Sequence, residues 1–224
     1  MTKNREYFVN EPIGAADACV IWLHGLGADG KDFLGIVDEL GLPINHAVRF
    51  IFPSAPFVKI TINNGMLMRG WYDIFDLSML QREDVAGMKQ SQTIINDLIQ
   101  HELDNGIASQ RIILAGFSQG GAMALYTGLR YPVALAGVIC LSAYLPLMAD
   151  FAVEKSQANQ ATPIFMAHGI FDPVVPYNMG HTAYEYLNKN DYKAAWHSYP
   201  MAHTLCIEEI AAIGKFLNRC LGYD

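Results

Sequence analysis

The sequence is short of basic residues and of long apolar runs, and each shortage excludes a class of protein. Lysine and arginine number 15 against 22 acidic residues, which gives a formal net charge of −7. An acidic chain with scattered cations is a poor partner for nucleic acid or for an anionic membrane surface. No run reaches the roughly 18 apolar residues that a membrane-spanning helix needs. Because residues 1–6 lead into no hydrophobic signal core, we expect a cytoplasmic protein without stable membrane insertion.

Cysteine is also scarce, with four in the chain. Cys19 and Cys140 lie within apolar, strand-like runs and are expected to be small core residues. Cys206 and Cys220 fall on one expected C-terminal helix, about 21 Å apart along its axis, which is too far for a disulfide. No spacing resembles a zinc site. The cysteines therefore predict free thiols in a reducing compartment.

Hydrophobic residues make up 52% of the 224, enough for the core of one α/β domain spanning residues 1–224. Apolar runs typical of strands alternate with helical segments, which predicts a mostly parallel sheet with helices on both faces. The stretch 142–162 is interpreted as an irregular polar excursion, too short for a separate cap domain. The expected strands are 18–23, 47–52, 111–115, 135–141, 163–168 and 193–199, and the expected helices are about 32–40, 84–104, 122–130, 177–189 and 204–221.

One stretch, Gly116-Phe117-Ser118-Gln119-Gly120-Gly121, contains the pattern Gly-x-Ser-x-Gly. It stands between a buried strand and a helix, the context in which this pattern marks a nucleophile. A turn this sharp strains the serine backbone and holds Oγ clear of the sheet. The helix that follows directs its free N–H groups toward the point where an oxyanion would develop. The sequence therefore predicts Ser118 as a nucleophile.

A serine hydroxyl needs a base to take its proton, and the base needs an acid to orient it. In this fold class the chain order is serine, acid, histidine. Two histidines, His197 and His203, follow the serine with a strand between. His197 falls inside the last expected strand, whereas His203 comes after it, at the edge of the sheet. A base must be free to face a cleft, which favours His203.

The acid is expected where the preceding strand ends. Asp172 lies in the loop 169–176, at the carboxyl edge of the predicted parallel sheet, where such sites occur. The same residue before Pro173 is also typical of a simple turn. Asp150, from the excursion, and Asp191, at a helix end, are the alternatives to Asp172.

The oxyanion of a tetrahedral intermediate needs two backbone donors. The N–H of Gln119, directly after the nucleophile, is one. The glycine-rich loop 24–30, after the first buried strand, is expected to give the other, and Leu26 is our choice. A phosphate-binding loop is the alternative interpretation, but the Gly-Lys-Ser/Thr ending of such loops is missing here.

The segment 53–82 is too long for a mere connection, and it is rich in large apolar side chains. Asn64-Gly65 indicates a small hairpin across residues 60–68. A long loop in a compact domain is usually functional. Because apolar loops can cover an acyl chain, and methionine adapts to several shapes, we expect this segment to form an acyl-binding groove. The residues expected to line it are Trp71, Met66, Met68 and Leu77.

With these residues placed, the chain resembles the carboxylesterase and acyl-protein thioesterase family of α/β hydrolases. The resemblance implies Ser118, Asp172 and His203 as the catalytic triad. It also implies Leu26 and Gln119 as oxyanion donors, no cofactor, and a monomer or weak homodimer. The matching stretches keep the family's order: His24-Gly25-Leu26-Gly27-Ala28-Asp29-Gly30, Arg69-Gly70-Trp71-Tyr72-Asp73, 116–121, Leu145-Pro146-Leu147, 168–176 and Met201-Ala202-His203.

Two positions depart from the family pattern. Gly70 replaces a more usual alanine, and Ala202 precedes the histidine where a larger residue is common. Neither belongs to the expected triad, so the hypothesis is a serine hydrolase that cleaves a small ester or an acylated substrate: a carboxylic ester, an acyl thioester or a lysophospholipid. A lyase or acyltransferase, or a non-catalytic ligand-binding protein, is the alternative on the same fold.

Overall fold

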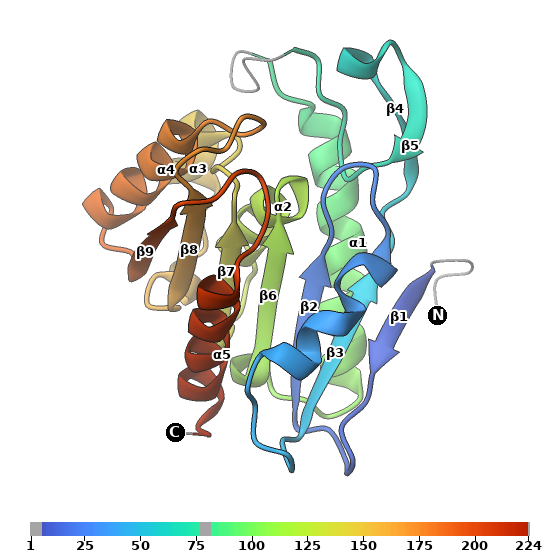
Figure 1. The fold of residues 1–224 in the computed structure, drawn as a ribbon, viewed down its shortest axis with the longest axis vertical. Coiled ribbons are helices and arrows are strands. Elements are labelled where there is room, and N and C mark those ends of the chain that lie inside the picture. Colours follow the sequence, from blue (N-terminus) through green and yellow to red (C-terminus); the bar gives the residue numbers. More distant parts are fainter. Residues whose placement is uncertain (1–5, 77–81, 224) are drawn as a thin grey trace.

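The computed structural model describes residues 6–76 and 82–223, built around a seven-stranded sheet in the order β1-β3-β2-β6-β7-β8-β9 (Figure 1). β1 pairs antiparallel with β3, and the other five pairs are parallel, as predicted. The strands are β1 (Tyr7–Asn10), β2 (Ala18–Leu23), β3 (Val48–Pro53), β6 (Ile112–Phe117), β7 (Gly137–Leu141), β8 (Ile164–Gly169) and β9 (Ala194–Tyr199).

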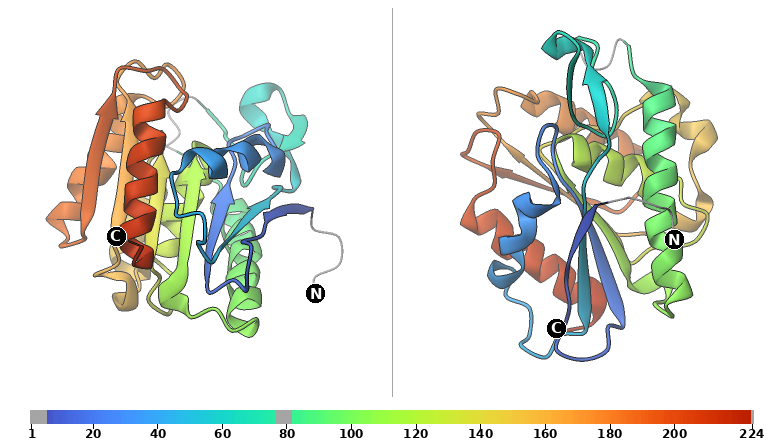
Figure 2. Two further views of the ribbon diagram at one scale, coloured as in Figure 1. Left: turned by 60° about the horizontal axis from the view of Figure 1, so that its bottom comes forward. Right: turned by 90° about the vertical axis from the view of Figure 1, so that its right-hand side faces the viewer.

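Helices cover both faces of the sheet (Figure 2). η1 and α5 lie on one face, and α1 and α2 pack on the other. Among the described residues, no helix is both long and apolar enough to cross a bilayer. The helices are η1 (Gly30–Glu39), η2 (Thr61–Asn63), α1 (Val85–Asp104), η3 (Ser109–Arg111), α2 (Gln119–Gly128), α3 (Met148–Glu154), η4 (Gln157–Asn159), α4 (Tyr177–Lys189) and α5 (Ile207–Leu221).

The strand β2 shows how the sequence builds two cores. All six of its residues are buried, as the continuous apolar run predicts for a strand covered on both sides. Cys19 and Ile21 pack into the core beneath α1, α2 and α4, whereas Val20 and Trp22 pack into the core beneath η1 and α5. The alternation follows from the two-residue period of a strand.

Three segments differ from the sequence prediction. β1 was not predicted, because a four-residue strand at a sheet edge, half exposed, carries no long apolar run. The helix expected at 32–40 is the 3₁₀ helix η1, which includes Gly30 and Gly35, two poor α-helix formers. The stretch 142–162 contains α3 and η4 rather than an irregular excursion, and residues 142–147 are buried.

The predicted hairpin is present as a separate two-stranded sheet of β4 (Phe57–Ile60) and β5 (Met66–Arg69). Its turn includes Asn64 and Gly65, whose φ angles of 55° and 71° are left-handed, which explains the Asn-Gly pair. In Figure 1 the hairpin projects beyond the end of the main sheet at which β2 and β6 finish.

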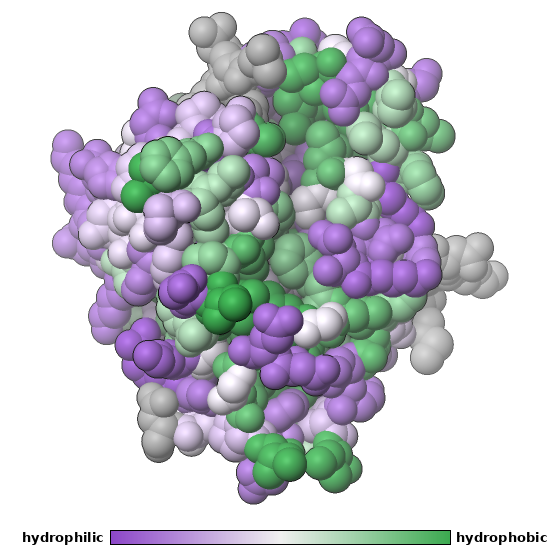
Figure 3. Space-filling model, viewed as in Figure 1, coloured by the Kyte–Doolittle hydropathy of each residue, from purple (hydrophilic) through white to green (hydrophobic). Residues whose placement is uncertain are grey.

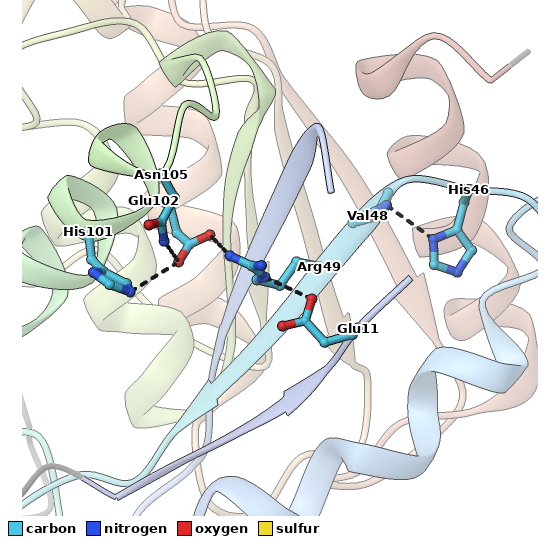
Figure 4. A network of polar contacts seen from close by, with 7 residues as sticks. All are labelled: Glu11, His46, Val48, Arg49, His101, Glu102 and Asn105. Carbon is cyan, nitrogen blue, oxygen red and sulfur yellow. Dashed lines mark hydrogen bonds and ion pairs between the residues drawn. The ribbon is translucent and has the colours of Figure 1, made fainter. Parts of the chain in front are cut away.

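At the opposite end of the sheet, an ion-pair network joins β3 to α1 (Figure 4). The Arg49 guanidinium donates from Nη1 to Glu102 Oε2 and from Nε to Glu11 Oε2, both at 2.9 Å. The Glu102 side chain is 2% exposed, and Asn105 Nδ2 lies 3.5 Å from its other oxygen. This network ties the start of β3 to the last turns of α1.

Candidate active site

Ser118 lies at the turn between β6 and α2, with φ 55° and ψ −123°, a strained conformation for a residue with a side chain. The flanking glycines are required by close packing. A Cβ at Gly116 would lie 2.2 Å from the Gly120 carbonyl oxygen, and one at Gly120 would lie 2.2 Å from the Leu23 carbonyl oxygen. The Ser118 N–H donates to the Leu141 carbonyl at 2.8 Å. The turn is therefore held in the shape that the Gly-x-Ser-x-Gly pattern predicts.

Three of the predicted side chains meet at the carboxyl edge of the sheet. The His203 ring nitrogen Nε2 lies 2.9 Å from Ser118 Oγ, and Nδ1 lies 2.6 Å from Asp172 Oδ2. The three residues come from the ends of β6, β8 and β9, which are separated along the chain. With a carboxylate on Nδ1, the histidine carries its proton there and leaves Nε2 free to accept from the serine hydroxyl.

The carboxylate of Asp172 is fixed by its own loop. Its Oδ1 accepts hydrogen bonds from the N–H groups of Val174 and Val175, at 2.8 and 2.9 Å, and its side chain is fully buried. His168 is buried beside it and donates from Nε2 to the Val175 carbonyl at 2.9 Å. Burial lowers the pKa of His168, so the ring stays neutral next to the carboxylate.

The alternatives weighed from the sequence lie elsewhere. His197 is inside β9, stacked on the Phe165 ring with centroids 4.5 Å apart. Asp150 lies in the first turn of α3 and Asp191 follows α4, and both residues are exposed. The carboxylate bonded to His203 is that of Asp172.

The two predicted oxyanion donors belong to two segments that meet at the serine turn. Gln119 opens α2, whose first turn receives no side-chain cap, so its N–H is free to bind an anion. Leu26 belongs to the loop 24–30 after β2, which we name the oxyanion loop after its predicted role. Within that loop, Gly25 packs against Ser118, since a Cβ there would be 3.4 Å from Ser118 Cβ. The oxyanion loop thus lies against Ser118, the predicted nucleophile.

A buried histidine, which sequence reasoning missed, fixes this oxyanion loop. His24 is 1% exposed, and its Nε2 accepts the N–H of Ala55 at 2.9 Å. The proton is therefore on Nδ1, which lies 2.7 Å from the Gly25 carbonyl. Burial lowers the pKa of His24, which keeps this neutral tautomer. The only sequence signal was its place at the start of the glycine-rich loop.

Trp71 supports the same loop through a hydrogen bond from its indole. Its indole Nε1 donates to the His24 carbonyl at 2.9 Å, and its backbone N–H donates to Gln119 Oε1 at 2.8 Å. The Gln119 amide in turn donates to the Tyr72 carbonyl at 2.7 Å. The side chain of Gln119 thus binds the backbone of the segment after β5 at two neighbouring residues, Trp71 and Tyr72.

The residues predicted to line an acyl groove differ in how far they are buried. Trp71 is 1% exposed, so it lies in the interior rather than on a groove wall, because its indole is engaged under the oxyanion loop. Met68 lies beside that loop, with its Cε 3.3 Å from where a Cβ of Gly27 would be. Met66 is 61% exposed on the hairpin. Leu77 lies outside the described residues.

The two departures from the family pattern have spatial explanations. A Cβ at Gly70 would lie 3.0 Å from Leu26 Cδ1 and 3.1 Å from Val58 Cγ2, so glycine leaves room for the oxyanion loop. Ala202 is exposed, so a larger side chain would extend into solvent there. Among the described residues, no group of three or more histidine, cysteine or acidic side chains is placed to hold a metal ion.

Comparison with known proteins places the chain in a family. The model of the phospholipase/carboxylesterase family matches residues 4–221. Acyl-protein thioesterase 1 of Neurospora crassa is 45% identical over 91% of this chain and 87% of its own, and that of Schizosaccharomyces pombe is 36% identical over 99% of each. The crystal structure of Zea mays acyl-protein thioesterase 2 superposes with a TM-score of 0.85 at 28% identity, over 97% of this chain and 99% of its own. The chain therefore belongs to the phospholipase/carboxylesterase family, and it is an esterase or thioesterase with the α/β-hydrolase fold.

Proposed function

We propose that the chain hydrolyses acyl esters and thioesters through an acyl-enzyme on Ser118, with His203 as base and Asp172 as the residue that orients it. The observation that carries the proposal is the pair of contacts from His203, 2.9 Å to Ser118 Oγ and 2.6 Å to Asp172 Oδ2. Nucleophile and base within hydrogen-bond reach, with the base held by an acid, is the arrangement that activates a serine. The lyase, acyltransferase and non-catalytic alternatives have no such specific support.

In the first half-reaction, Ser118 Oγ attacks the acyl carbon while its proton passes to His203 Nε2. The negative charge that develops on the carbonyl oxygen is held by the N–H groups of Leu26 and Gln119. The bond to the alcohol oxygen or thiol sulfur then breaks, and His203 gives its proton to that leaving atom. In the second half-reaction, water attacks the acyl-enzyme through the same steps, and the carboxylic acid is released.

The acyl chain is proposed to leave the oxyanion loop along Met68 and the hairpin toward Met66. Figure 3 shows apolar surface over the hairpin, where Phe57, Met66 and Leu67 are all more than half exposed. Each buried methylene contributes up to about 0.8 kcal/mol, so kcat/KM should rise with acyl length until the surface is covered. Met68→Ala should flatten that rise. Met179→Ala, at a half-buried methionine of α4 away from the hairpin, is the matched control.

The substrate class is proposed from the relatives, which are named acyl-protein thioesterases. Activity on matched esters, thioesters and lysophospholipids of one acyl length would rank the classes. Ser118→Ala and a fluorophosphonate label test the nucleophile in the same assay. One label on Ser118, absent in the variant, supports the proposal, whereas labelling at another residue contradicts it.

We further propose a cytoplasmic protein that is a monomer or a weak homodimer. Cys19, Cys140 and Cys206 are free thiols, which fits a reducing compartment. Sedimentation across a hundredfold range of protein concentration would test the assembly state. A dimer that persists at the lowest concentration would contradict it.

A further inference from the structure

A pocket of about 490 Å³ opens next to His203, on the face of the sheet covered by η1 and α5. In Figure 1 these two helices lie in front of the sheet, and they pack into one hydrophobic core. The pocket is distinct from the hairpin, because none of the described residues that line it comes from β4 or β5. Its lining includes Asp32, Phe33, Glu39, Phe117 and His203.

The chemistry of acyl transfer decides which half of a substrate faces this pocket. As the Ser118 Oγ–carbon bond forms and the carbon–oxygen or carbon–sulfur bond breaks, the proton on His203 Nε2 moves to the leaving atom. The leaving atom must therefore lie within hydrogen-bond distance of Nε2. The alcohol or thiol part extends from that atom on the His203 side, whereas the acyl chain extends from the oxyanion loop.

Aromatic rings and carboxylates determine what the pocket can bind. The Phe33 and Phe117 rings lie 6.0 Å apart between centroids, and Phe117 lies 4.7 Å from the His203 ring. Asp32 and Glu39 are exposed residues of η1 on the same lining. Among the described lining residues none is lysine or arginine, and Lys31 is engaged over the Phe8 ring at 5.2 Å.

We infer that this pocket receives the leaving group, and that it favours an alcohol or thiol with a cationic head of the quaternary ammonium type. Aromatic faces attract such cations, and carboxylates nearby add Coulomb attraction that counterions screen. The apolar walls accept the methyl groups of the head, which a small inorganic cation lacks. The inference rests on the proposed function, because it needs His203 as the proton donor.

The test uses two esters of the same size and shape that differ in charge. Butyrylcholine and 3,3-dimethylbutyl butyrate carry the same acyl group, and a quaternary nitrogen in one replaces a quaternary carbon in the other. The wild-type ratio of kcat/KM, choline ester over neutral ester, should be about three to ten, as expected for cation–π and exposed carboxylate contacts. In the double variant Asp32→Asn, Glu39→Gln the ratio should fall toward one.

Asp38→Asn is the matched control, because Asp38 is exposed on the same helix but does not line the pocket. It should keep the wild-type ratio. Raising the ionic strength from about 0.05 to 0.5 M should lower the ratio for the wild type, which decides the question even if the double variant fails to fold.

A wild-type ratio of one or less, or a ratio that ignores both salt and the double substitution, overturns the inference while leaving the hydrolase intact. If neither ester is cleaved and no acyl-enzyme forms, the proposed function fails instead, and the inference fails with it.

Discussion

At the carboxyl edge of the sheet, Asp172 is buried beside His203; at the opposite edge, Glu102 is buried beside Arg49. Both carboxylates are almost fully removed from water, and each has a nitrogen partner within 3 Å. The partners differ in what they can do. An imidazole takes and gives a proton near neutral pH, whereas a guanidinium keeps its charge throughout. The first pair therefore suits proton transfer, and the second can serve only to hold β3 and α1 together.

A third buried carboxylate, Glu209, makes the comparison sharper. It lies in the first turn of α5, is fully buried, and has no ion-pair partner among the described residues. Burial raises its pKa to about 8, and the neighbouring Cys206 backbone N–H offsets part of that rise. Without a cation, the folded protein favours the protonated form of this residue at neutral pH.

The largest expected effect comes from changing the carboxylate that faces histidine. Asp172→Asn should lower kcat by about four orders of magnitude, because the amide no longer holds the productive tautomer of His203. Its thermal midpoint should stay near that of the wild type, since the Asn oxygen still accepts the N–H groups of Val174 and Val175. Steady-state kinetics and a thermal scan measure both. A mild loss of kcat here, with a severe loss in Asp150→Asn or Asp191→Asn, would assign the role of orienting acid to that other residue.

Removing the guanidinium at the opposite edge should do the reverse. Arg49→Met leaves the Glu102 carboxylate buried without its cation, which costs about 3 kcal/mol of unfolding free energy. Turnover of a short ester should not change. Glu11→Gln is the matched control, because Glu11 is an exposed partner of the same arginine, and it should cost less than about 1 kcal/mol. Equal destabilisation in the two variants would show that the buried pair has no special role.

A smaller effect on activity and stability is expected from changing Trp71, the interior residue that supports the oxyanion loop. Trp71→Phe keeps an aromatic ring but leaves the buried His24 carbonyl without its donor, at a cost of about 1 to 3 kcal/mol. Because the loop rather than the groove is disturbed, kcat should fall by a similar factor for short and long acyl esters, with little change in KM. A loss confined to long acyl chains would instead identify Trp71 as a groove wall.

The smallest effect concerns the unpaired carboxylate. The folded-state pKa of Glu209, about 8, exceeds that of the unfolded chain, so its contribution is present at low pH and lost as pH rises through 8. Between pH 7 and 9 the wild type should lose on the order of 1 kcal/mol more stability than Glu209→Gln. Urea unfolding at the two pH values measures this difference. Parallel losses in both proteins would mean that Glu209 does not titrate in this range.

The three residues predicted as a triad, Ser118, Asp172 and His203, each follow a strand with a strong local pattern, and their side chains meet in the structure. Parallel strands end at one edge, so residues that follow different strands could be brought together by topology alone. The same reasoning predicts Leu26 and Gln119 as oxyanion donors. It did not reach β1, whose four residues alternate only weakly between half-buried and exposed.

What the sequence could not predict is mostly set by contacts between distant segments. The indole of Trp71 reaches a carbonyl 47 positions away, at His24, and nothing in the local pattern separates that role from a groove wall. The tautomer of His24 likewise depends on the N–H of Ala55, which follows the neighbouring strand β3. Local patterns fix where a strand ends, whereas tertiary packing decides which way a side chain turns.

In the proposed mechanism, every turnover carries the acyl group on Ser118 Oγ. Rapid-quench mass spectrometry of the wild-type enzyme with an activated ester tests it directly, because acylation should run ahead of hydrolysis. The account predicts a transient adduct with the mass of the acyl group, mapped by proteolysis to the peptide that contains Ser118 and absent in Ser118→Ala. An adduct on another residue, or turnover at the wild-type rate in Ser118→Ala, would contradict it.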